Sequence, residues 1–174
     1  MTKIILVLIC CGTVFAESVA LTQNYVDSRT GLLIHFPAGW TVDHDAGAFR
    51  ITNFDLSRSL PQLIVPMGGA QLVLTGAPTG VKTAQDWLSS DRITPTNGYD
   101  LSEVEIHIPG YQRAPAVLAR SHPRGIPDST IVLCLFSIDG QLLKASMLCR
   151  TRGKSHALED ILIAVIQNLE KPKR

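Results

Sequence analysis

The residues best suited to catalysis do not form a recognised catalytic pattern in this sequence. The chain has five histidines and four cysteines, but no GxSxG, HExxH or paired-carboxylate motif. Ser121 and His122 are adjacent, and adjacent residues form a nucleophile–base pair only in a suitable tertiary arrangement. We therefore expect no catalytic residue. A small metal-dependent or hydrolytic enzyme that uses His122 or His44 is kept as an alternative.

The segment Asp43-His44-Asp45 offers three possible metal ligands. In a strand, Asp43 and Asp45 would point one way and His44 the other. The remaining histidines include His35, His107 and His122, which are scattered along the sequence. We therefore expect a solvated acidic loop after Trp40, with no metal and no cofactor.

Residues 76–83 lie between an expected strand and an expected helix, which is where a phosphate-binding loop occurs. The spacing differs from that motif at two points. Gly76 and Gly80 are separated by one residue too few, and Val81 separates Gly80 from Lys82. The sequence therefore predicts a Gly/Pro turn with Thr83 as the helix N-cap, not a nucleotide site.

A basic segment precedes the last expected helix and contains Arg150, Arg152 and Lys154. A helix N-terminus carries partial positive charge and free N–H groups. Basic side chains beside it could hold a carboxylate, a phosphate or an acidic partner surface. These three residues are our candidate anion or partner site, and the alternative is a solvated basic loop. Residues 171–174 are expected to be a basic tail.

The first 16 residues have the pattern of a signal peptide. Lys3 precedes an apolar run, and Val14 and Ala16 are suitable for the −3 and −1 positions of a cleavage site. We expect cleavage between Ala16 and Glu17 and an exported protein, either periplasmic or extracellular. The run is shorter than the roughly 20 residues of a membrane span. Lipidation at Cys10 or Cys11, giving a lipid-anchored envelope lipoprotein component, is the alternative.

Composition is typical of one globular domain. Of 174 residues, 45% are hydrophobic and 18% charged, and the net charge is +1. This balance lacks the broad positive charge that nucleic-acid binding requires. Charge is unevenly distributed: residues 17–110 hold ten acids and five bases (net −5), and residues 111–174 hold ten bases and five acids (net +5).

Hydrophobic patterning predicts an α+β fold built on a mainly antiparallel sheet. After a lead-in segment, strands are expected at 31–36, 48–54, 62–66, 70–75, 101–108, 112–120, 129–138 and 141–150. A short helix should follow Thr83, and an amphipathic helix capped by Ser155 should span 155–170. We expect Trp40 and Trp87 to be core anchors rather than walls of a ligand pocket.

Asp139-Gly140 is a strong signal for a two-residue hairpin turn. This turn would pair Cys134 with Ala145 and Cys149 with Thr130. The two cysteines would then lie roughly 13 Å apart along the strands, which is too far for a disulfide. We therefore expect two free, buried thiols. A Cys134–Cys149 bridge would require a different strand register.

The segment GLLIHFPAGWTV, a strand that ends in Pro-x-Gly-Trp before a second strand, resembles the start of domains in the PsbP-like superfamily. The later order is also similar: the strand GAQLVL, a short helix near Trp87, a DG hairpin and a terminal helix. The resemblance covers residues 24–170, after a signal peptide (1–16) and a lead-in (17–23). It implies an α/β/α sandwich with the C-terminal helix packed on the sheet. It also implies a non-enzymatic accessory or binding role with a protein partner that the sequence does not identify, and it supplies no site residues.

Overall fold

A computed structural model describes residues 19–45, 48–55, 65–108, 111, 114–123, 128–151 and 156–171. The elements are β1 (Leu21–Asp27), β2 (Leu32–Pro37), β3 (Thr41–Asp45), β4 (Ala48–Thr52), β5 (Ala70–Gly76), α1 (Ala84–Ser90), the 3-10 turn η2 (Pro95–Asn97), β6 (Tyr99–Ile106), β7 (Ala114–Ser121), β8 (Ser129–Ile138), β9 (Gln141–Arg150) and α2 (His156–Gln167). Neither described helix is long and apolar enough to cross a bilayer.

Seven strands form one sheet in the order β3-β4-β5-β9-β8-β7-β6, and every neighbouring pair is antiparallel. β1 and β2 form a separate antiparallel pair. The described residues therefore confirm the expected α+β fold with a mainly antiparallel sheet. β3 and β6 are the two edges of the large sheet.

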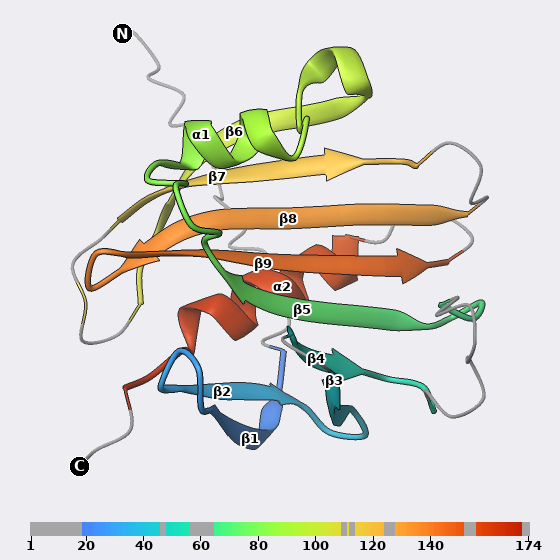
Figure 1. The fold of residues 1–174 in the computed structure, drawn as a ribbon. Helices are drawn as coiled ribbons and strands as arrows, with labels where there is room; N and C mark the ends of the chain where they lie inside the picture. Colours follow the sequence, from blue (N-terminus) through green and yellow to red (C-terminus); the bar gives the residue numbers. More distant parts are fainter. Residues whose placement is uncertain are drawn as a thin grey trace, which may run out of the picture.

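The large sheet lies between the two helices, as Figure 1 shows. Alternate residues of β9 divide between its faces: Met147 belongs to the core cluster that contains Leu162 of α2, and Leu142 to the cluster that contains Trp87 of α1. The β1–β2 pair lies on the α2 side, where Leu33 N donates to Glu170 O at 2.7 Å. The fold is therefore an α/β/α sandwich with the C-terminal helix on the sheet.

An ion pair also joins α2 to the sheet. Arg120 of β7 donates from Nε to Glu159 Oε2 of α2 at 2.7 Å, and its Nη2 contacts Glu159 Oε1. The hydrogen bond to Glu159 raises the pKa of Arg120. Because β7 is the second strand from the β6 edge, this contact ties one end of the helix to a strand outside the central β8–β9 hairpin.

Two segments differ from the sequence expectation. Strand β1 begins inside the lead-in (17–23) and continues to Asp27, and its Tyr25 stacks on Phe49 with ring centroids 5.0 Å apart. The acidic segment 43–45 lies in β3 rather than in a loop, because all five residues of β3 pair with β4. The strand expected at 62–66 falls largely outside the described residues, and Val65 and Pro66 are not in a strand.

The β8–β9 hairpin has the bounds and the register that the sequence predicts. Cys134 lies opposite Ala145, and Cys149 lies opposite Thr130. Both cysteines are free thiols and both are buried. The prediction of two unbridged thiols on one sheet face is therefore confirmed.

Burial of Cys134 makes stability depend on pH. It raises the pKa of this thiol from 9.0 to about 12. As the pH rises, the unfolded chain therefore loses this proton before the folded chain does. The stabilisation is fully present below pH 9 and is lost as the pH rises toward 12. Between pH 7 and 10, the free energy of unfolding should fall by about 1 kcal/mol more in wild type than in Cys134→Ala, as measured by urea unfolding. Equal losses in both proteins would contradict this assignment.

Candidate functional site

The Pro37-Ala38-Gly39-Trp40 motif forms the turn between β2 and β3. Gly39 has φ +77°, a conformation that side chains other than glycine rarely adopt. Trp40 is 8% exposed and belongs to the core cluster on the α2 side. Its backbone N–H donates to Pro37 O at 3.4 Å. The motif therefore fixes the point at which β3 begins.

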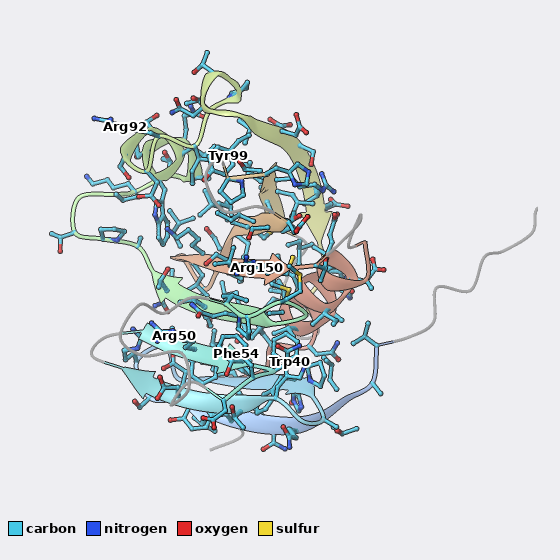
Figure 2. All side chains as sticks on the ribbon, turned by 90° about the vertical axis from the view of Figure 1, so that its right-hand side faces the viewer. Trp40, Arg50, Phe54, Arg92, Tyr99 and Arg150 are labelled. Atoms are coloured by element: carbon cyan, nitrogen blue, oxygen red, sulfur yellow. The ribbon has the colours of Figure 1, made fainter. Side chains whose placement is uncertain are left out.

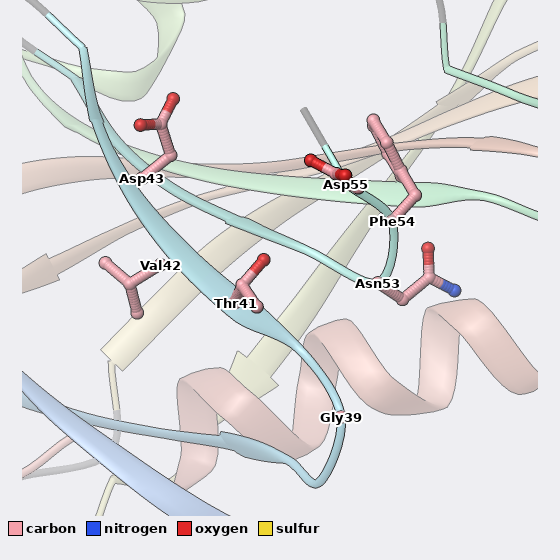
Figure 3. Close-up of a pocket in the computed structure, with 7 residues that line it drawn as sticks. All are labelled: Gly39, Thr41, Val42, Asp43, Asn53, Phe54 and Asp55. Carbon is pink, nitrogen blue, oxygen red and sulfur yellow. The ribbon is translucent and has the colours of Figure 1, made fainter. Parts of the chain in front are cut away.

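A cavity of about 370 Å³ opens beside this turn. Gly39 lies at one end of it (Figure 3). The other lining residues come from β3 and from the segment that follows β4: Thr41, Val42, Asp43, Asn53, Phe54 and Asp55. We call this cavity the β3–β4 hollow.

Hydrogen bonds fix the segment after β4 in place. The side chain of Asn53 accepts from Ala70 N at 2.7 Å and donates to Gly68 O at 3.4 Å. Thr52 Oγ1 donates to Phe54 O at 2.9 Å. In Figure 3 the Asn53 amide points away from Phe54 and Asp55. Asn53 is therefore a positioning residue that ties the wall of the hollow to the start of β5.

The hollow is acidic. In Figure 3, Asp43 lies on β3, and Asp55 and Phe54 lie together across from it on the segment that follows β4. Asp43 is 41% exposed, and its Oδ2 lies 3.7 Å from Arg50 Nη1 on the neighbouring strand. Asp55 is exposed and Phe54 is half-buried. Carboxylates beside an aromatic ring suit an organic cation, which can form ion pairs and a cation–π contact.

The chain matches no family model and no curated protein. Among solved structures, it matches a crystal structure from Bacteroides thetaiotaomicron with a TM-score of 0.54 at 13% identity, over 88% of this chain and 50% of that one. The two chains share a fold. This chain spans about half the length of that protein.

A second match is the solution structure of cyanobacterial PsbP from Synechocystis sp. PCC 6803. It has a TM-score of 0.48 and 12% identity, over 92% of this chain and 98% of that one. A PsbP structure is therefore among the structural neighbours of the chain, at low sequence identity.

Of the three residues of the candidate anion or partner site, only Arg150 lies in the described part of the chain. Arg150 is the last residue of β9, while Arg152 and Lys154 lie outside the described residues, as do Ala16 and Glu17. The tryptophans are buried in different clusters, Trp40 on the α2 side and Trp87 on the α1 side.

Among the described residues, the adjacent Ser121 and His122 show no nucleophile–base geometry. His122 Nδ1 lies 3.2 Å from Thr130 Oγ1, while Ser121 is buried at the end of β7. No group of three His, Cys, Asp or Glu residues that could hold a metal is present in the described part of the chain. The side chains of His44 and Asp45 are outside that part.

The loop before α1 is the capped turn that the sequence predicts. Thr83 Oγ1 accepts from Asp86 N at 3.1 Å, and Asp86 Oδ2 accepts from Thr83 N at 3.0 Å. The side-chain and backbone hydrogen bonds from Thr83 lower the pKa of Asp86. The carboxylate of Asp86 thus satisfies N–H groups at the helix start that a phosphate would use.

Sequence reasoning missed the hollow as a site. Asp43 was considered only as a metal ligand, and Asn53, Phe54 and Asp55 carry no motif. The one available signal was the Pro-x-Gly-Trp turn, because Gly39 both completes this motif and lines the hollow.

Proposed function

We propose that this protein is an exported, non-catalytic accessory or binding module of the cell envelope, which holds a basic side chain of a protein partner in the β3–β4 hollow. One observation carries the proposal: two carboxylates and an aromatic ring line the same open hollow. The resemblance of the sequence to PsbP-like domains, which implies a binding role, supports it. The signal-peptide pattern of residues 1–16 supports export.

Arginine fits this site best. Its planar guanidinium can bind a carboxylate through two hydrogen bonds and can stack on an aromatic face. Val42 and Phe54 offer apolar surface for its aliphatic part, while Asp43 and Asp55 offer acceptors. Because Asn53 anchors the segment beside them, these groups keep their positions before the partner arrives. This preorganisation lowers the cost of binding.

Photo-cross-linking from inside the hollow tests the proposal. A photoreactive phenylalanine analogue at position 54, in protein exported by its own host, should yield one discrete cross-linked partner. The matched control places the analogue at Tyr99, which is also half-buried but lies on β6 at the opposite edge of the sheet. Figure 2 labels both positions. The absence of a cross-linked product from position 54, or the same cross-linked product from both positions, would contradict binding of the partner in the hollow.

The mass of the uncross-linked protein in the same preparation tests the export step. A chain that begins at Glu17 supports cleavage by a signal peptidase. A chain that begins at Cys10 or Cys11 and carries the added mass of acyl groups would support the lipid-anchored alternative. An uncleaved chain that remains in the cytoplasm would contradict export.

A further inference from the structure

Arg150 and Ser129 lie directly opposite each other where β9 ends and β8 begins. Opposed residues of an antiparallel pair direct their side chains to the same face of the sheet. Ser129 is 5% exposed, and Arg150, labelled in Figure 2, is half-buried. Arg150 Nε and Ser129 Oγ are both buried, and both lack a hydrogen-bond partner among the described residues.

Two unsatisfied donors in one cross-strand pair are unusual, because buried polar atoms are nearly always hydrogen-bonded. Arg29, Arg50 and Arg120 each have a carboxylate partner, in Asp27, Asp43 and Glu159. In the described part of the chain, no carboxylate pairs with Arg150. Its guanidinium therefore has a positive charge and no counter-ion among the described residues.

The backbone around Arg150 is held on both sides. Its N–H donates to Gly69 O at 3.0 Å, and its carbonyl accepts from Gly68 N at 2.7 Å. Thr151 N donates to Asp128 O at 2.9 Å. Gly69 is tightly packed, since a Cβ there would lie 2.9 Å from Pro66 O. These contacts place the base of the arginine side chain before any ligand binds.

We propose that Arg150 and Ser129 form a subsite for an oxyanion, either a carboxylate or a phosphate group. An oxyanion would accept from Arg150 Nε and Ser129 Oγ together and would supply the missing negative charge. The subsite lies on β8 and β9, whereas the hollow lies on β3 and after β4. The subsite binds an anion, whereas the hollow is proposed to bind a cation. The failure of one proposal therefore does not affect the other.

Titration of the wild-type protein with two simple anions tests the subsite. The ¹H–¹⁵N signal of Arg150 Nε is followed while sodium phosphate or sodium acetate replaces sodium chloride at constant ionic strength. We expect a saturable shift with at least one anion. A stronger response to phosphate identifies a phosphate site, and a stronger response to acetate identifies a carboxylate site. No saturable shift with either anion overturns the proposal.

Variants distinguish anion binding at this subsite from a general effect of the charge of the protein. Arg150→Met should weaken binding of the effective anion by at least about tenfold, and Ser129→Ala by several-fold, since both donate to a charged acceptor. Lys82→Met is the matched control, because Lys82 is exposed and lies in the loop before α1. It should bind as wild type does. If Arg150→Met does not fold, the test rests on Ser129→Ala. An unchanged affinity of Ser129→Ala for the anion then contradicts the subsite.

Discussion

Replacing Trp87 with alanine is expected to lower the free energy of unfolding by about 3–5 kcal/mol. Trp87 is 2% exposed and packs in the α1-side cluster with Leu133 and Leu135 of β8. Its Nε1 donates to Asp91 Oδ2 at 3.1 Å. Lys144 Nζ lies 5.1 Å from the ring centroid and 2.5 Å from the same carboxylate oxygen. The substitution removes every contact of the indole ring, including the hydrogen bond to Asp91 and the contact with Lys144, and leaves a large cavity.

The loss of unfolding free energy should be large because α1 depends on its contacts with the sheet to remain folded. The helix has seven residues, and isolated helices of that length are not stable in water. Trp87 and Leu88 are its buried residues, so they attach it to the sheet. Without Trp87, part of the apolar surface of β8 becomes accessible to water.

Urea unfolding of wild type, Trp87→Ala and Trp87→Phe measures this effect. The phenylalanine variant keeps an apolar ring but loses the hydrogen bond to Asp91, so it should fall between the other two proteins. A Trp87→Ala protein within about 1 kcal/mol of wild type would show that α1 contributes little to the fold.

The β8–β9 hairpin was the most predictable part of the fold. Asp139-Gly140 allows a tight turn, and a two-residue turn fixes every cross-strand pair that follows. The free thiols of Cys134 and Cys149 follow from that register. Local sequence and tertiary structure agree here, because strands of ten residues on each side are rich in buried side chains.

β1 and β3 were not predicted, because each forms through pairing with a neighbour rather than through its own pattern. Three of the seven residues of β1 are exposed in one run, so its alternation is weak. β3 contains Asp43 and Asp45, which have low strand propensity. Its place at the edge of the sheet lets the Asp43 side chain lie beside solvent while the backbone pairs with β4.

The two candidate sites show the same dependence on tertiary structure. Arg150 is one of three basic residues chosen from the sequence as a candidate anion site, and that role stays a prediction. The register predicted from Asp139-Gly140 already places Ser129 opposite Arg150, but only the structure shows that Ser129 Oγ and Arg150 Nε are buried without a hydrogen-bond partner. The hollow was also not predicted, since residues 41–43 and 53–55 meet only after β3 pairs with β4.

Neutralising both acids of the hollow should weaken partner binding by about tenfold or more, since each carboxylate loses a charged contact with the bound cation. The variant is Asp43→Asn with Asp55→Asn, which keeps the side-chain shapes. Urea unfolding accompanies the binding measurement, because Asp43→Asn removes an ion-pair partner of Arg50, whose side chain is 12% exposed. The matched control is Asp100→Asn with Glu103→Gln, which removes two exposed acids from β6 at the opposite sheet edge.

The most direct test of the binding role is the dissociation constant of the partner that cross-links from position 54. This constant is measured for wild type and for the two double variants. The acidic hollow predicts weaker binding only in the Asp43/Asp55 variant, with both variants folded as wild type. Equal affinity for all three proteins, or an equal loss in the β6 control, would contradict recognition of a basic group in the hollow.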